Sequence, residues 1–89
     1  MKIKEIRELQ RELGYAPMQR IIDDGSAWYL EGSTGRLAMS LLEMGACFLP
    51  KKSFKGPYGN VIPSRDMLEA GSKGTLENTI NYYERICTY

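Results

Sequence analysis

The sequence predicts a mostly α-helical domain, a compact bundle of three to five helices with at most a short two-stranded β-pair. Its 89 residues are 43% hydrophobic and 26% charged, which is typical of one small globular domain over residues 1–89. Apolar residues recur at spacings of three and four in several segments, which indicates amphipathic helices. No internal repeat or low-complexity stretch divides the chain.

The first 25 residues predict two helices that contact each other. Apolar side chains of the first helix recur at Ile3, Ile6, Leu9 and Leu13. Gly14 is a suitable end for this helix. Pro17 suits the first turn of a second helix, because that turn needs no amide hydrogen there. The apolar face of the second helix is formed by Met18, Ile21 and Ile22, and Gly25 ends it.

The middle of the chain predicts a central helix. Residues 25–32 fit either a strand or a single helical turn, because short apolar runs look alike in both. Within them, Trp28 is expected in the core and Tyr29 on the surface. Ser33 or Thr34 is expected to cap a helix from about residue 35 to residue 44. Residues 46–49 (ACFL) are expected to follow as a buried strand or extended segment.

The rest of the chain predicts turns followed by a final helix. Three of the four prolines lie between residues 50 and 63. Residues 58–62 are expected to form a turn and a short strand that pairs with residues 46–49. Ser64 is expected to cap a brief helix over residues 65–70, and Thr75 a helix running to the C-terminus. The last helix carries one narrow apolar face, formed by Leu76, Ile80, Tyr83 and Cys87.

Composition argues against catalysis and against bound metals or cofactors. The chain has no histidine, so it lacks the commonest general base and the commonest metal ligand. Its two cysteines lie 40 positions apart, at residues 47 and 87, which excludes a Cys-x-x-Cys motif. Cys47 lies in an apolar run that should raise its pKa and make it a poor nucleophile. We therefore expect a protein that is not an enzyme and has no cofactor.

The chain is expected to be cytoplasmic, with no membrane partner. Residues 1–10 (MKIKEIRELQ) alternate charged and apolar side chains and lack the features of a secretory signal. The most apolar stretch, residues 37–50, is shorter than the ~20 residues that a membrane-spanning helix requires.

Residues 50–75 are the candidate partner-binding segment. The net charge of the whole chain is only +1, but this segment holds five cations against Asp66 and Glu69, a balance of +3. Aromatic side chains lie among the cations, a combination that suits either a protein contact or single-stranded nucleic acid. Against this interpretation, lysine-rich loops are common on surfaces, and aromatic side chains also serve simply to anchor a loop to the core. The candidate residues are Lys51, Lys52, Phe54, Lys55, Tyr58, Arg65 and Lys73.

Two glycine-rich sites each precede a predicted helix, at residues 32–36 (GSTGR) and 71–75 (GSKGT). Free amide groups at a helix start attract anions, which makes Ser33, Gly35 and Arg36 candidate anion-binding residues. Neither site has the spacing of a nucleotide-binding motif. Helix capping is the simpler explanation of both.

Four segments resemble small uncharacterised proteins of bacteriophages and prophage-bearing bacteria. They are residues 30–36 (LEGSTGR), 45–50 (GACFLP), 58–65 (YGNVIPSR) and 71–75 (GSKGT). The resemblance spans residues 26–75 and implies an origin, but it carries over no functional residue. Phage accessory proteins of this size often bind a host protein stoichiometrically, which by analogy is the function expected here.

The sequence leads to one expected function and two alternatives. The expected function is non-enzymatic binding of an unidentified protein through the segment from residue 50 to residue 74. The first alternative is weak binding of single-stranded nucleic acid through the same lysines. The second is a structural homodimer, formed through an apolar helix face that so small a core leaves uncovered.

Overall fold

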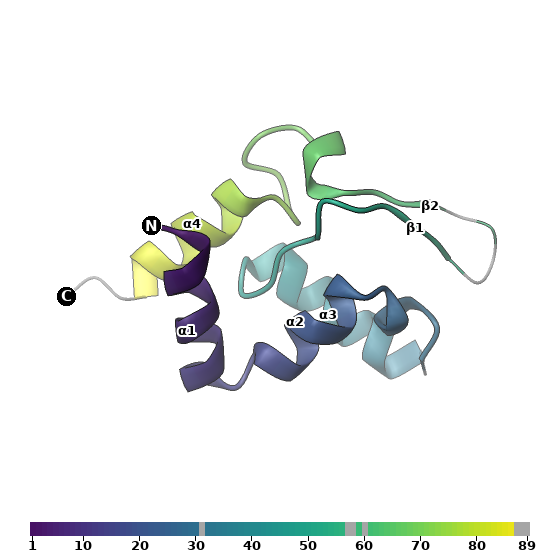
Figure 1. Ribbon diagram of the computed structural model, residues 1–89, viewed down its shortest axis with the longest axis horizontal. Coiled ribbons are helices and arrows are strands. Elements are labelled where there is room, and N and C mark those ends of the chain that lie inside the picture. The colour runs from purple at the N-terminus through teal and green to yellow at the C-terminus, as the bar shows by residue number, and fades with distance from the viewer. Residues whose placement is uncertain (31, 57–58, 60, 87–89) are drawn as a thin grey trace.

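The computed structural model describes residues 1–30, 32–56, 59 and 61–86 (Figure 1). Within them it has four α-helices: α1 (Ile3–Leu13), α2 (Ala16–Asp23), α3 (Gly32–Met44) and α4 (Leu76–Ile86). Two single turns of 3-10 helix, η1 (Ser26–Trp28) and η2 (Arg65–Met67), accompany a β-hairpin of β1 (Phe54–Lys55) and β2 (Val61–Ile62). The predicted mostly helical fold with a short β-pair is therefore confirmed.

The molecule is elongated, and its Cα atoms extend over 43 × 26 × 18 Å. Helix α1 contacts both α2 and α4, so the first and last helices meet at one end, as Figure 1 shows. The hairpin projects at the opposite end. Helices α2 and α3 each contact η1, which links them. Among the described residues, no helix is long and apolar enough to cross a membrane.

Helix α1 begins and ends as its sequence predicts, but its buried face includes a polar residue. The Glu5 carboxylate accepts a hydrogen bond from the Lys2 amide at 3.3 Å. Gly14 ends the helix in the left-handed region, with φ 87°, which glycine adopts without strain. Ile6 is fully buried, and so is Gln10, whereas the predicted core residue Leu13 is half exposed. The buried stripe is therefore partly polar.

The core consists of two clusters joined by the chain from residue 46 to residue 49. Phe48 packs with Ile6 and Tyr83 between α1 and α4. The larger cluster, under α3, contains Ile22, Ala27, Ala38, Leu41, Leu42, Ala46, Cys47 and Leu49. Phe48 thus enters one cluster, while its two chain neighbours Cys47 and Leu49 enter the other, on the opposite side of the segment. Its predicted burial is confirmed.

The predicted strand pairing is wrong. Residues 61–62 pair antiparallel with residues 54–55, with Phe54 opposite Ile62 and Lys55 opposite Val61, and not with residues 46–49. The backbone of residues 46–48 is bonded instead mostly to side chains of the helices. Gln10 and Tyr83 donate to the Ala46 carbonyl, at 3.0 and 2.6 Å. Since these groups already have partners, no strand is needed beside them.

Two other boundaries differ from the prediction, and one open alternative is resolved. Helix α3 begins at Gly32, so Ser33 and Thr34 lie in its first turn instead of capping it. The helix expected over residues 65–70 is only the 3-10 turn η2, because Leu68 is already extended, and the Ser64 side chain makes no cap hydrogen bond. Of the two alternatives for residues 25–32, the structure has the single helical turn, over residues 26–28.

Helix α4 follows its sequence signals closely. The Thr75 hydroxyl accepts a hydrogen bond from the Asn78 amide at 3.3 Å, which confirms the predicted cap. Tyr83 is buried on the predicted face, with Leu76 and Ile80 partly buried beside it. Cys87, the fourth predicted member of that face, lies outside the described residues.

Candidate partner-binding surface

The segment from residue 50 to residue 74 is held to the core at both ends. The Arg65 amide donates to the Pro50 carbonyl at 2.9 Å, and the Arg65 guanidinium donates to the Leu49 carbonyl at 3.1 Å. The Leu49 amide donates to the Gly74 carbonyl at 2.9 Å. These bonds attach Arg65 and Gly74 to the chain at residues 49 and 50. The β-hairpin projects between Pro50 and Arg65.

Phe54 anchors the hairpin. Its ring lies against Gly25, where an added Cβ would come within 2.6 Å of the Phe54 Cδ1 atom. The Lys52 ammonium lies 5.6 Å from the centre of the same ring. Tyr29 adds a second attachment, because its hydroxyl donates to the Lys55 carbonyl. Phe54 therefore serves the packing of the hairpin and offers little free surface on which a base would stack.

Most cations of the segment have no carboxylate partner. The described residues form two ion pairs, Arg7 with Asp23 at 3.2 Å and Lys73 with Glu43 at 3.5 Å. No described carboxylate oxygen thus lies within 4.0 Å of the charged nitrogens of Lys51, Lys52, Lys55 or Arg65. The three lysines are exposed, whereas Arg65 is half-buried. The three exposed lysines remain available for a partner, whereas Arg65 already donates to the Leu49 carbonyl.

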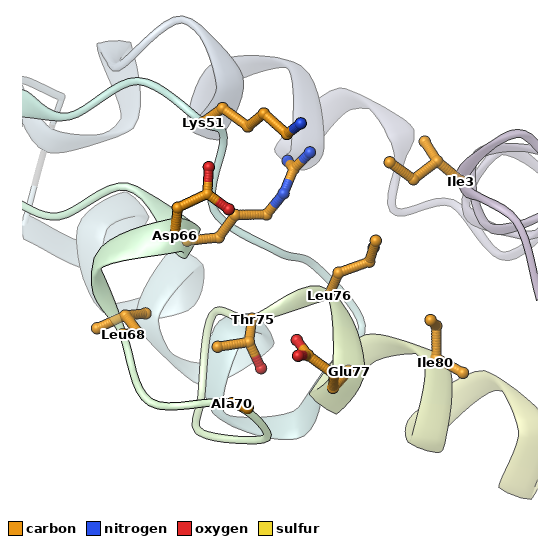
Figure 2. Close-up of a pocket in the computed structure, with 10 residues that line it drawn as sticks. Ile3, Lys51, Asp66, Leu68, Ala70, Thr75, Leu76, Glu77 and Ile80 are labelled. Atoms are coloured by element: carbon orange, nitrogen blue, oxygen red, sulfur yellow. The ribbon is translucent and has the colours of Figure 1, made fainter.

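Lys51 and Arg65 line one pocket, here called the Lys51 pocket, of about 420 Å³ (Figure 2). The carboxylates of Asp66 and Glu77 line it as well. The Arg65 guanidinium carbon lies 5.5 Å from the centre of the Phe48 ring, and this contact orients the Arg65 side chain. Figure 2 shows Lys51 on the far side of the pocket from the start of α4. The remaining lining is mostly apolar: Ile3, Leu68, Ala70, Thr75, Leu76 and Ile80.

A second pocket of about 410 Å³, here called the Trp28 pocket, adjoins the first. Leu68 lines both pockets and separates them. The lining of the Trp28 pocket is apolar except for two residues near one another in sequence, Ser72 and Lys73. The apolar residues are Trp28, Met39, Leu42, Leu49, Ile62, Pro63 and Leu68. Sequence reasoning missed this pocket because its walls come from separate parts of the chain.

A third, polar groove of about 600 Å³ lies between α1 and α2 and is lined by Arg7, Arg11 and Arg20 together with Asp23 and Asp24. Both carboxylates are already engaged. Asp23 accepts from Arg7 and from Gln19, at 3.2 and 2.8 Å. Hydrogen bonds from the Ser26 hydroxyl and amide lower the pKa of Asp24. Of the three arginines only Arg7 is paired with a carboxylate of the groove, so the lining keeps an excess of one positive charge.

The structure gathers only part of the predicted partner-binding residues. Lys51 and Arg65 share one pocket, and Lys73 lies in the other, beside Glu43. Lys52 and Phe54 contact each other, and Lys55 lies on the hairpin. Tyr58 lies outside the described residues.

The candidate anion-binding residues belong to the first two turns of α3 rather than to a loop before it. Ser33 and Gly35 lie within the first turn. The Arg36 guanidinium folds back toward Gly32, 3.5 Å from the position of an added Cβ. No further feature of the described residues marks an anion site there.

The buried cysteine is unsuited to nucleophilic chemistry. Burial, aided by the negative charge of Asp23, raises the pKa of Cys47 to about 12. Its thiol is free and fully buried. The predicted direction of this shift is confirmed. Among the described residues, no group of three or more histidine, cysteine, aspartate or glutamate side chains is placed to hold a metal ion.

A comparison of the chain with protein-family models found no match, and comparisons with curated proteins and with solved structures found none either.

Proposed function

We propose that this protein is a non-enzymatic binding module that recognises another protein through residues 50–74. The observation that carries the proposal is the set of cations without a carboxylate within 4.0 Å, at Lys51, Lys52, Lys55 and Arg65. Large apolar side chains of the same segment are exposed, 61% for Val61 and 64% for Met67. Apolar contacts flanked by charges are typical of protein interfaces.

The chemistry of the segment supports binding better than turnover. Its charged groups are four lysines and one arginine against Asp66 and Glu69, and outside the segment the buried Cys47 thiol is held protonated by its raised pKa. A role as a phage-type accessory protein, acting stoichiometrically on a host protein, agrees with this arrangement. We place the protein in the cytoplasm as part of the same proposal.

A capture experiment tests the proposal. The tagged protein is incubated with lysate of cells that encode it, alongside a variant with Lys51, Lys52 and Lys55 changed to Ala. A matched control carries Ala at Arg11, Arg20 and Arg85, which removes three exposed cations that lie outside the segment and line neither the Lys51 pocket nor the Trp28 pocket. We expect at least one captured protein that binds the wild type and the control but does not bind the variant with Lys51, Lys52 and Lys55 changed to Ala. If every captured protein is retained equally by all three, the proposal is wrong.

Weak binding of single-stranded nucleic acid is the second candidate, because the same unpaired cations suit phosphate groups. A labelled oligo-dT titration at low salt tests it. Binding through these lysines should weaken steeply with salt and again in the Lys51, Lys52 and Lys55 variant. The attachment of Phe54 to Gly25 argues against base stacking on that ring. The absence of binding at low salt would eliminate this candidate.

A homodimer is the third candidate, because α3 exposes about half of Leu37 and Met44, which lie seven positions apart on one face. Light scattering over a range of concentrations tests it. A mass that stays monomeric at the highest concentration would exclude this candidate.

A further inference from the structure

We infer that the Lys51 pocket binds a small zwitterion with a partly apolar body, of the amino-acid or short-peptide type. The acidic group of this ligand lies beside Lys51 and Arg65, and its ammonium group faces the carboxylates of Asp66 and Glu77. Binding of such a ligand is separate from the proposed recognition of a protein and does not depend on it.

The pocket combines both signs of charge in equal number. Two cations, Lys51 and Arg65, and two carboxylates, of Asp66 and Glu77, line one space of about 420 Å³, a volume within the range of small-ligand pockets. Neither carboxylate comes within 4.0 Å of the charged nitrogens of the two cations. A simple anion is attracted by one pair of these groups and repelled by the other, and the same holds for a simple cation. A ligand with one charge of each sign interacts favourably with both pairs.

Separate elements hold these charges apart. Arg65 and Asp66 belong to η2, whereas Glu77 lies in the first turn of α4. The Arg65 guanidinium is fixed by its hydrogen bond to the Leu49 carbonyl at 3.1 Å, and its further N–H groups can bind a ligand. Figure 2 shows the Lys51 ammonium and the Glu77 carboxylate on opposite sides of the pocket. The opposite charges are therefore arranged for a ligand that reaches from one side to the other.

The rest of the lining suits an apolar body. Ile3 from α1 lies on one side of the pocket together with Leu76 and Ile80 from α4. Leu68 and Ala70 lie on the other side. A side chain of the size of leucine would remove apolar surface from water there, which favours binding. The lining thus favours a zwitterion with an apolar side chain over one without, such as glycine.

Titration of the isotope-labelled protein with free leucine and with leucyl-leucine, followed by amide chemical shifts, tests the inference. Two analogues keep the apolar body but carry only one charge: N-acetyl-leucine has the carboxylate, and leucinamide has the ammonium group. Glycine carries both charges but lacks the apolar side chain. These comparisons use the wild type and therefore do not depend on the folding of a variant.

Two variants with matched controls locate the site. Lys51→Met and Glu77→Gln each remove one charge from the pocket. Lys55→Met and Glu12→Gln make the same chemical changes at exposed residues that do not line it. Circular dichroism verifies the folding of all four. Because Glu77 lies outside residues 50–74, its variant examines the pocket without altering the segment that is proposed to bind a protein.

We expect leucine or leucyl-leucine to shift, in a saturable way, the amide signals of residues that line the pocket. Removal of either charge from the ligand, Lys51→Met and Glu77→Gln should each weaken binding by about fivefold, whereas Lys55→Met and Glu12→Gln should leave it unchanged. Glycine should bind more weakly than leucine. Tighter binding of leucine than of leucyl-leucine would identify an amino-acid ligand, and the reverse a short peptide.

Three outcomes would each overturn the inference: no saturable shift with either ligand, equal binding of the singly charged analogues, or binding that Lys51→Met and Glu77→Gln leave unchanged. If the titrations fail in one of these ways while lysate capture still depends on Lys51, Lys52 and Lys55, the proposed function stands and the zwitterion site is wrong.

Discussion

Gln19 forms a two-point hydrogen bond with the backbone of Phe48. Its Oε1 accepts from the Phe48 amide at 3.0 Å, and its Nε2 donates to the Phe48 carbonyl at 2.9 Å. The same Oε1 accepts from the Gln10 amide group at 2.8 Å, which links α1 to α2. Both glutamines are 1% exposed. Two buried side-chain amides therefore form hydrogen bonds with the backbone of Ala46 and Phe48, as a neighbouring strand would in a sheet.

Replacing Gln19 with Leu should strongly destabilise the fold. The substitution leaves the Phe48 amide and carbonyl buried without these partners, and each unsatisfied group costs about 1–3 kcal/mol. We expect the free energy of unfolding to fall by about 2–4 kcal/mol, measured by urea denaturation. The control is Glu12→Ala on the exposed face of α1, which should change it by less than about 0.5 kcal/mol. A similar loss in both variants would contradict this role.

Two glycines with similar backbone angles should respond differently to alanine. Gly14 and Gly45 have φ 87° and 100°, so either substitution adds backbone strain of roughly 1 kcal/mol. An added Cβ meets no atom within 4 Å at Gly14, but at Gly45 it lies 2.9 Å from the Asn78 backbone oxygen. Gly45→Ala should therefore lower the melting temperature clearly more than Gly14→Ala does. Equal shifts would show that the contact with α4 is easily relieved.

Thr75 should act as the N-terminal cap of α4, whereas Ser33 should not cap α3. Thr75→Ala removes the acceptor of the Asn78 amide and should cost about 1 kcal/mol, within the usual range for caps. Ser33 is exposed in the first turn of α3, so Ser33→Ala should be nearly neutral. Thermal unfolding of the two variants compares them directly. A larger loss of stability for Ser33→Ala than for Thr75→Ala would show that Ser33 caps α3, as the sequence predicts.

Alkaline pH should weaken the fold through Cys47. Burial raises the pKa of this thiol from 9.0 to about 12, so the folded protein keeps the proton that the unfolded chain releases. Stability from this group is complete below pH 9 and falls as the pH rises from 9 toward 12. In a Cys87→Ser background, which isolates Cys47, a thiol reagent should react at pH 8 only after unfolding. Rapid modification of the folded protein would contradict the burial of this thiol.

The helices were predictable because their signals are local. The three- and four-residue spacing, Gly14 after the first helix and Thr75 before the last all act within one or two turns. The start of α3 was misplaced because Ser33 and Thr34 are also tolerated inside a first turn, where a cap signal and a helix signal look alike. Gln10 was not expected in the core, since its burial depends on partners 9 and 36 positions away.

The candidate site was predictable only in part. The positive charge of residues 50–75 is visible in the composition, and Lys51 and Arg65 do share a pocket. The attachment of Phe54 to Gly25 and the placement of Lys73 beside Glu43 join residues about 30 positions apart, so spacing offered no indication of either.

The sequence alone determined where three of the helices lie, that Cys47 is buried, and that the cations concentrate in one segment. Each of these follows from periodicity, caps or composition, which act over a few neighbouring residues. Only the tertiary structure decided that side chains of α1, α2 and α4 satisfy the backbone of residues 46–48, that residues 61–62 pair with residues 54–55, and that a pocket opens beside Trp28. These features depend on groups far apart in the chain, whose hydrogen bonds and apolar surfaces find partners only once the helices have packed.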